Sequence, residues 1–142
     1  MEDHEAAAGF DTRRPRSLKR AVSLAESFRY AFAGLRYAFG SQRNIRIQSL
    51  LGLIAIALGL WLQLSLVEWA VLVLTIALVL VTEMVNTVFE TLVDLVSPTY
   101  DPLAAIAKDV GAAAVISAAI AAVVVGGLLF LPKLLALAGL GR

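Results

Sequence analysis

Hydrophobic and polar positions divide the chain into a polar start, one amphipathic stretch and three long apolar runs. Residues 1–16 are polar and have no period, so we expect a disordered tail there. Residues 17–47 repeat apolar side chains at helical spacing, with Arg29, Arg36 and Arg43 on one side of the apolar stripe. This pattern is typical of a surface helix lying in a membrane interface, and a solvated basic face is the alternative interpretation.

Two local signals mark the ends of this amphipathic helix. Ser23 followed by Glu26 predicts a capping box near its start. Gly40 with Ser41 predicts a break or bend near its end. The amphipathic segment should therefore be separate from the apolar runs that follow.

The first apolar run, residues 49–67, contains no charged residue. As a helix it would nearly cross the hydrocarbon core of about 30 Å. Trp61 and Trp69 flank a short connection near residues 63–68, and tryptophan favours the membrane–water boundary. We therefore expect one span followed directly by a second span in the opposite direction.

The second apolar run, residues 69–82, is too short to cross a membrane alone, because as a helix it covers only about 21 Å. The span must therefore continue through Glu83 and Glu90 toward Pro98, which should end it. Glu83 should lie within the membrane and Asp94 near its surface.

A third span is predicted after a polar connection. Asp101 should cap a helix that has Pro102 at its first position. The uncharged run of residues 110–131 is rich in small residues that allow close helix packing, and Pro132 should end it. We predict an all-α integral membrane protein with three transmembrane helices in residues 48–132 and a short C-terminal tail in residues 133–142.

Composition supports the membrane interpretation and narrows the chemistry. The chain is 60% hydrophobic and 16% charged, more apolar than a soluble domain. It has no cysteine, and its single histidine is His4, so thiolate sites are excluded and a histidine-based site is disfavoured. Lys and Arg concentrate in residues 1–48, which predicts a cytoplasmic N-terminus.

The second span carries a polar stripe that the membrane would otherwise disfavour. At helical spacing the stripe is about 16 Å long, and it consists of Glu83, Asn86, Thr87, Glu90 and Asp94. Such residues could bind a hard cation, supply a general base, or relay ions. Asn86 and Thr87 could instead only join helices. Without a G-x-x-x-x-G-K-[ST] loop, the pattern leaves metal-dependent chemistry and ion transport both open.

The stripe and the connection after it resemble a known family. The motif E-x-x-N-T-x-x-E-x-x-x-D from Glu83 to Asp94, then S-P-T-Y-D-P-L-A-A-I-A-K-D at residues 97–109, is similar to the small bacterial diacylglycerol kinase/undecaprenol kinase family. G-L-R-Y-A-F at residues 34–39 and R-N-I-R-I-Q at residues 43–48 resemble its N-terminal part. The resemblance implies a multi-pass, homotrimeric lipid kinase of the bacterial inner membrane with sites shared between chains. Its implied partners are ATP and a membrane lipid alcohol, with Mg²⁺ as cofactor and no nucleic acid.

The resemblance also implies roles for individual residues. Glu83 would be the general base on the lipid hydroxyl, supported by Asn86, and Glu90 would hold Mg²⁺. Nucleotide contacts would come from Tyr30, Gln42, Glu90, Asp94, Thr99, Tyr100, Asp101, Lys108 and Asp109. Lipid contacts would come from Arg36 and Arg46. By spacing alone, Lys108 and Asp109 could equally be an interfacial pair at a helix start.

Several positions depart from the family's pattern. Gln42 stands where a glutamate is often a second metal ligand, and an amide binds Mg²⁺ more weakly than a carboxylate. Thr99 and Asp101 replace common Glu and His, and Phe89 replaces a small residue. The P-L-A-x-I-A-K-D form of the connection favours undecaprenol over diacylglycerol as substrate. An oligomeric ion or proton pathway and a non-catalytic family member are the alternative interpretations.

Overall fold

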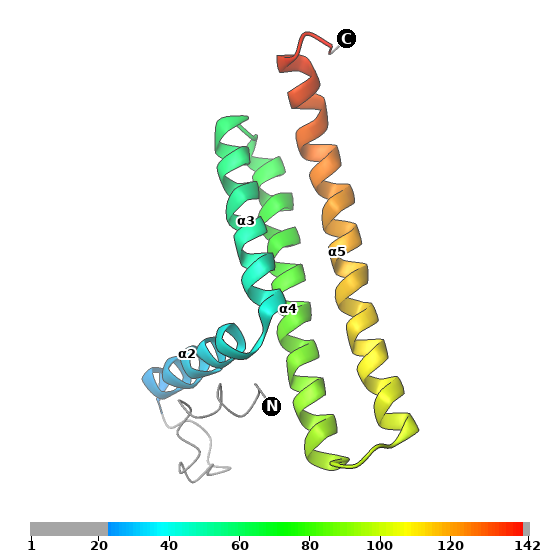
Figure 1. Cartoon of the computed structure of the whole chain (residues 1–142). Coiled ribbons are helices and arrows are strands. Elements are labelled where there is room, and N and C mark those ends of the chain that lie inside the picture. Colours follow the sequence, from blue (N-terminus) through cyan, green and yellow to red (C-terminus); the bar gives the residue numbers. More distant parts are fainter. Residues whose placement is uncertain (1–22, 141–142) are drawn as a thin grey trace. The chain divides into compact units, whose positions relative to one another are not determined.

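The structure of the chain is a computed structural model that describes residues 23–140. The predictions for residues 1–16, and for the start of the amphipathic helix at residues 17–22, lie outside the described residues. The described part is helical without a strand (Figure 1), and its helices are α2 (Leu24–Ser41), α3 (Arg43–Trp61), α4 (Leu66–Val96) and α5 (Pro102–Leu137). The chain divides into two units, Met1–Arg46 and Ile47–Arg142, and each is described by itself.

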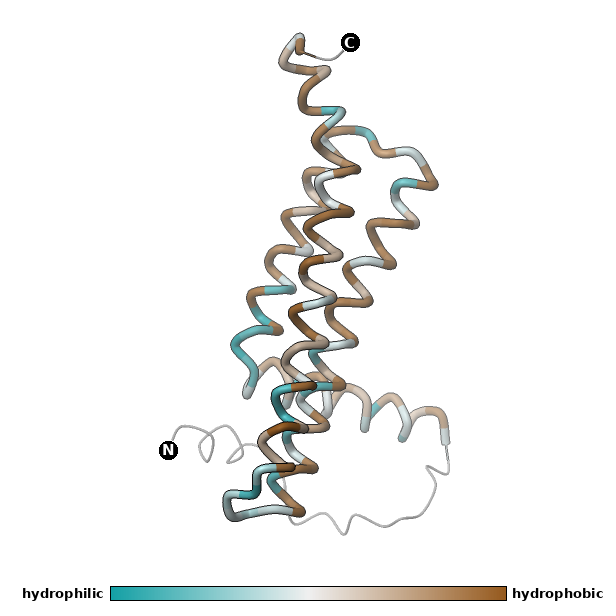
Figure 2. The backbone as a smooth tube through the Cα atoms, turned by 90° about the vertical axis from the view of Figure 1, so that its right-hand side faces the viewer, coloured by the Kyte–Doolittle hydropathy of each residue, from teal (hydrophilic) through white to brown (hydrophobic). Residues whose placement is uncertain are grey.

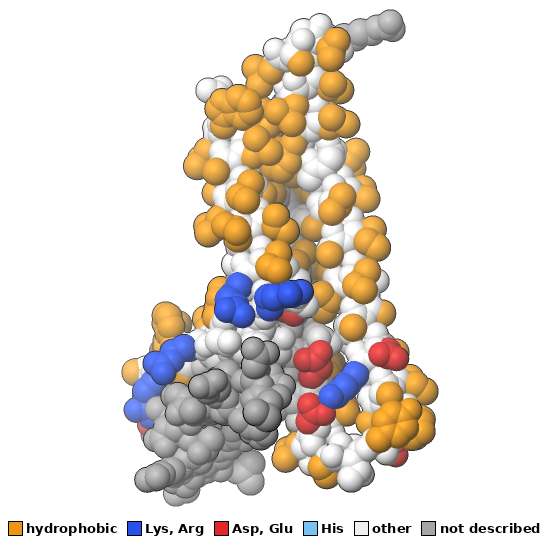
Figure 3. All heavy atoms as spheres, viewed as in Figure 1, with side chains coloured by type: hydrophobic (Ala, Val, Ile, Leu, Met, Phe, Trp, Pro, Cys, Tyr) orange, Lys and Arg blue, Asp and Glu red, His pale blue; other side chains and the backbone are white. Residues whose placement is uncertain are grey.

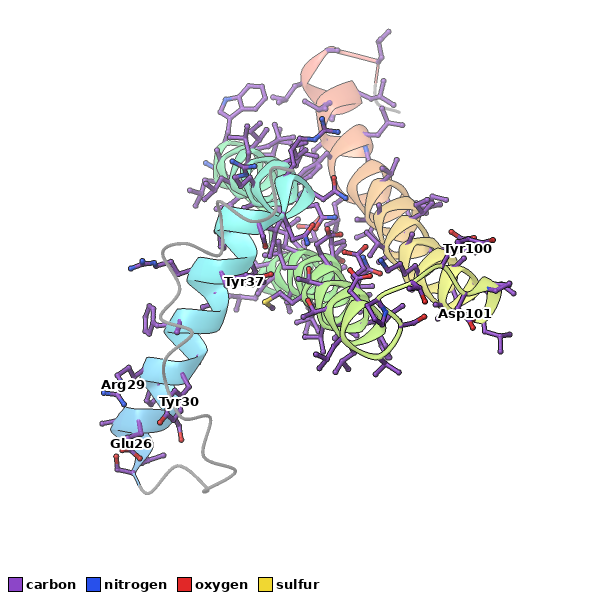
Figure 4. The ribbon with its side chains drawn as sticks, turned by 60° about the horizontal axis from the view of Figure 1, so that its bottom comes forward. Glu26, Arg29, Tyr30, Tyr37, Tyr100 and Asp101 are labelled. Carbon is purple, nitrogen blue, oxygen red and sulfur yellow. The ribbon has the colours of Figure 1, made fainter. Side chains whose placement is uncertain are left out.

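Helix α2 makes up most of the described part of the first unit, and Ser23 caps it at the position that the sequence predicts. The Ser23 hydroxyl accepts a hydrogen bond from the backbone N–H of Glu26 at 3.3 Å. The helix stops at Gln42, whose backbone is extended and whose N–H donates to the Ala38 carbonyl at 2.9 Å. Residues 17–47 are therefore not one continuous helix. Figure 4 shows Glu26, Arg29 and Tyr30 near the start of α2 and Tyr37 further along it.

The turn between α3 and α4 comes earlier than the apolar pattern predicts. Helix α3 ends at Trp61, and Gln63 adopts a left-handed backbone conformation in the turn. Ser65 and Glu68 then form a capping box: the Glu68 carboxylate accepts from the Ser65 N–H at 2.7 Å, and the Ser65 hydroxyl accepts from the Glu68 N–H at 3.4 Å. Because this box starts a new helix, the apolar run of residues 49–67 is divided between two helices.

Helix α4 continues without a break through the acidic stretch, as its predicted length requires, and Ser97 caps it just before Pro98. The Asp101 carboxylate accepts from the N–H groups of Leu103 at 2.7 Å and Ala104 at 3.1 Å, which starts α5 at Pro102 as predicted. Helix α5 then runs back alongside α4 in the opposite direction (Figure 1).

The prediction that Pro132 ends the third helix is wrong, because α5 continues to Leu137. Proline removes only one backbone hydrogen-bond donor. In an apolar environment, a non-helical segment would leave many more backbone N–H and C=O groups unpaired. The next residue, Lys133, forms an ion pair of 3.2 Å with Glu68 at the start of α4. Residues 133–137, which the sequence predicts as part of a C-terminal tail, therefore belong to helix α5.

Three helices, α3, α4 and α5, are long and apolar enough to cross a membrane. Hydrophobic residues predominate along them (Figure 2), and many large apolar side chains on their surfaces are exposed. Acidic and basic side chains gather toward the end of α4 and the start of α5 (Figure 3). The protein is an all-α membrane protein, as the sequence predicts.

Candidate active site

The deepest residue of the acidic stripe is Glu83, near the middle of α4. Its side chain is fully buried, with 1% relative exposure. Within the second unit, Nε2 of Gln48 on α3 donates a hydrogen bond to Oε2 of Glu83 at 3.2 Å. The Thr87 hydroxyl donates to the Glu83 backbone carbonyl at 3.0 Å. A buried carboxylate thus faces a neutral amide, while Thr87 is satisfied by its own helix.

One turn further along α4, Asn86 and Glu90 form a second contact of the stripe. Nδ2 of Asn86 donates to Oε1 of Glu90 at 2.9 Å, across the i to i+4 spacing of the helix. Asn86 is buried, and its Oδ1 has no hydrogen-bond partner among the described residues. That oxygen lies against Gly111 of α5, where an added Cβ would collide with it. Gly111 therefore lets α5 approach the Asn86 amide closely.

The shallow end of the stripe meets the start of α5. Nζ of Lys108 lies 2.5 Å from Oδ1 of Asp94, with side-chain exposures of 38% and 65%. The structure thus joins the last acid of the motif to the lysine of the A-K-D segment. Exposure increases along α4 from buried Glu83 through half-buried Glu90 to exposed Asp94. The stripe leads from the apolar interior to water.

The connection between α4 and α5 is exposed, and Figure 4 shows Tyr100 and Asp101 on it. The Ser97 hydroxyl donates to the Thr99 carbonyl at 3.0 Å, which closes the turn. Asp101 caps α5, so it has a structural function independent of any ligand. Asp109 is exposed beside Lys108. Nucleotide contacts by these residues stay predictions.

Four of the predicted site residues, Tyr30, Arg36, Gln42 and Arg46, belong to the first unit. The Arg29 guanidinium lies over the Tyr30 ring, 5.5 Å from its centroid. Gln42 occupies the extended position between α2 and α3. Arg46 lies in the first turns of α3. Roles of these residues toward nucleotide, metal or lipid stay predictions.

A divalent cation would find an incomplete ligand set within the described part of one chain. No group of three or more Asp, Glu or His side chains gathers in residues 23–140. The half-buried Glu90 carboxylate nevertheless fits Mg²⁺, which prefers oxygen ligands and is commonly held by one or two carboxylates together with substrate phosphates. The residues present are therefore compatible with a cation that arrives with a nucleotide.

Sequence reasoning missed Gln48. The sequence shows it only as the last letter of R-N-I-R-I-Q, and nothing in its spacing points to Glu83 on another helix. The available signal is its position, because Gln48 stands at the border of an apolar span. A polar side chain entering a membrane is costly unless it has a partner.

The chain matches known proteins over most of its length. Residues 29–130 match the family model described as prokaryotic diacylglycerol kinase. A diacylglycerol kinase of Synechocystis sp. is 52% identical over 118 residues, covering 82% of this chain and 67% of that protein. The undecaprenol kinase of Bacillus subtilis is 34% identical over 109 residues, covering 77% and 89%. The Escherichia coli diacylglycerol kinase is 33% identical over 95 residues, covering 67% and 78%.

Together with the fold, these matches define an integral-membrane lipid kinase, a phosphotransferase that acts on an alcohol group with ATP as co-substrate. The chain belongs to the prokaryotic diacylglycerol kinase family. Membership selects the lipid-kinase interpretation of the protein over the ion-pathway interpretation. It leaves the roles of individual residues to be argued from their geometry.

Proposed function

We propose that the protein transfers the γ-phosphate of ATP to the hydroxyl of a membrane lipid, with Glu83 as general base. The observation that carries this proposal is the burial of the Glu83 carboxylate inside a membrane-spanning helix. An ionisable group in that position is costly and is usually retained for function. Because Glu83 lies on a membrane-spanning helix, a lipid hydroxyl would approach it from the bilayer.

The reaction conserves atoms and charge in one displacement. The Glu83 carboxylate accepts the proton of the lipid hydroxyl as the hydroxyl oxygen bonds to the γ-phosphorus. The bond between the γ-phosphorus and the β,γ-bridging oxygen breaks, and ADP leaves with that oxygen. Catalysis of such a transfer depends mainly on positioning and on neutralising the phosphate charge.

The shallower residues of the stripe are suited to the nucleotide. Lys108 supplies a positive charge at the exposed end, where ATP arrives from water. Glu90 lies between that end and Glu83, and its carboxylate would hold Mg²⁺ on the phosphates. When bound, the cation would neutralise phosphate charge as the transfer proceeds. Asn86 fixes Glu90 through the hydrogen bond to Oε1.

The lipid substrate has two candidates. The connection P-L-A-x-I-A-K-D favours undecaprenol, whereas the relative with 52% identity is named a diacylglycerol kinase and the undecaprenol kinase is 34% identical. Identity over a long alignment samples more of the site than one short segment, so we place diacylglycerol first. An apolar cavity of about 250 Å³ among α3, α4 and α5, with Gln48 in its lining, supports entry of a hydrocarbon chain near Glu83.

The decisive experiment measures phosphate transfer from labelled ATP to diacylglycerol and to undecaprenol in parallel, with and without Mg²⁺. We expect Glu83→Gln to lower kcat at least 100-fold, because it removes the base and keeps the shape. Glu68→Gln is the matched control, since it makes the same change in the first turn of α4. Full activity of Glu83→Gln would remove Glu83 from the chemistry. Absence of Mg·ATP binding in the unaltered protein would favour a non-catalytic family member.

We also propose a homotrimer in the bacterial inner membrane, with sites shared between chains and a cytoplasmic N-terminus. The concentration of Lys and Arg in residues 1–48 supports this orientation. The chain has no cysteine, so single cysteines introduced at exposed Thr99 and Leu66 can report the sides of the membrane. Labelling of Thr99→Cys from outside intact cells would reverse the proposed orientation.

A further inference from the structure

The buried carboxylate of Glu83 has an uncharged hydrogen-bond partner, the side-chain amide of Gln48. Nε2 of Gln48 donates to Oε2 of Glu83 at 3.2 Å from the neighbouring helix. A donor of this kind favours the ionised form of a carboxylate, which burial disfavours. An amide does so without a charge of its own.

The second observation concerns the other half of the same amide. Oε1 of Gln48 is buried and has no hydrogen-bond partner among the described residues. A buried acceptor left unpaired is costly, and such atoms call for an explanation. Because the amide carries donors on one side and an acceptor on the other, rotation would present Oε1 to Glu83 in place of Nε2.

We propose that Gln48 is the positioning residue of Glu83, holding its carboxylate through Nε2 before phosphate transfer and its carboxylic acid through Oε1 afterwards. This inference rests on the proposed role of Glu83 as general base. In the first state the amide N–H donates to the carboxylate. In the second state the acid O–H, which now carries the proton of the lipid hydroxyl, donates to the amide oxygen. One side chain thereby satisfies both protonation states without a movement of the helices.

Within the second unit, other charged groups have partners elsewhere or lie on other parts of the helices. Helix α3 carries no titratable residue from Ile47 to Trp61. On α4 and α5, Asp94 pairs with Lys108 and Glu68 pairs with Lys133. The three that remain are Glu90, which accepts from Asn86, Asp101, which caps α5, and exposed Asp109. Gln48 is therefore the group of this unit through which the protonation of Glu83 can be altered most directly.

The test compares kcat and KM for ATP of three Gln48 variants in lipid bilayers. Gln48→Leu removes both the donor and the acceptor, so it should lower kcat about 10- to 100-fold with little change in KM for ATP. Gln48→Glu replaces the amide donor by a second carboxyl beside Glu83, so it should lower kcat as well. Gln48→Asn keeps the amide and should recover part of the loss.

Ser117→Ala is the matched control, because it removes an exposed hydroxyl that bonds only within α5 at 2.8 Å. It should leave both kcat and KM for ATP unchanged. If Gln48→Leu keeps the parent kcat while Glu83→Gln is inactive, the inference about Gln48 fails alone. If Glu83→Gln stays active, the proposed function fails. Should Gln48→Leu not fold, a parent kcat for Gln48→Glu, which is nearly the same shape, overturns the inference.

Discussion

The ammonium of Lys108 lies 2.5 Å from the carboxylate of Asp94 and ties the start of α5 to the last turns of α4. Both side chains are substantially exposed, so the ion pair itself contributes little stability, at most about 1 kcal/mol. Its consequence is positional, because it holds a positive charge at the exposed end of the acidic stripe. On the proposed function, a nucleotide that arrives from water would meet this end first.

We expect Lys108→Met to raise KM for ATP about tenfold or more while the stability of the protein changes by less than about 1 kcal/mol. The reason is that a charge-assisted contact to phosphate is lost, and only a solvent-screened ion pair is lost with it. Steady-state kinetics and denaturant unfolding measure the two effects. The reversed pair, Asp94→Lys with Lys108→Asp, separates them: recovery of KM would mean that the ion pair matters and that Lys108 does not contact ATP.

The ion pair at the opposite end of α4 should behave differently. Lys133→Met breaks the 3.2 Å contact with Glu68, and both side chains of this ion pair are partly exposed. We expect a small loss in unfolding free energy, because solvent screens the pair, and an unchanged kcat, because the contact lies far from Glu83 along α4. Lys133→Arg keeps the charge and is the control. A large fall in kcat without loss of stability would contradict the purely structural role.

The close approach of Gly111 to Asn86 gives a steric prediction. A Cβ at residue 111 would collide with Oδ1 of Asn86 and lie 3.5 Å from its Cγ, so the amide must shift. Since Asn86 donates a hydrogen bond to Glu90, we expect Gly111→Ala to lower kcat about tenfold and to weaken the binding of Mg·ATP. Gly127→Ala is the matched control on the same helix, because its Cβ meets nothing within 4 Å. Equal activity of the two variants would show that the Asn86 amide has room to move.

Sharing of sites between chains can be tested by mixing inactive variants. The predicted nucleotide residue Tyr30 belongs to the first unit, and Glu83 belongs to the second. If one site takes these residues from different chains, Tyr30→Ala and Glu83→Gln subunits should form some intact sites when reassembled together. We expect activity to return on mixing in detergent and reconstitution. No recovery at any ratio, with mixed oligomers demonstrated by a tag, would indicate sites within single chains.

Much of the fold follows from local signals in the sequence. Ser23 with Glu26, and Asp101 with Pro102, predict helix starts that the structure has, because capping depends on residues two or three apart. Helical spacing also predicts the stripe from Glu83 to Asp94. The depth of each carboxylate follows from its distance along the helix, which the sequence supplies.

Contacts between distant residues could not be predicted in the same way. Gln48 and Glu83 come from different helices, and so do Glu68 and Lys133, so their pairing depends on helix packing and not on spacing. The continuation of α5 through Pro132 was also missed. A proline often ends a helix in water, because water can hydrogen-bond to the backbone groups that are freed. In a membrane no water is available to those groups, so the helix continues past a proline more readily.

The pairing of Glu68 with Lys133 fixes the start of α4 against α5. Glu83 follows Glu68 by fifteen residues, which places it about 22 Å away along the helix. If Glu68 marks one boundary of a hydrocarbon core of about 30 Å, the proposed base lies about 8 Å inside the opposite boundary. A bilayer of different thickness would change the depth of the lipid hydroxyl relative to Glu83. On the proposed function, we therefore expect the rate to depend on the thickness of the host membrane.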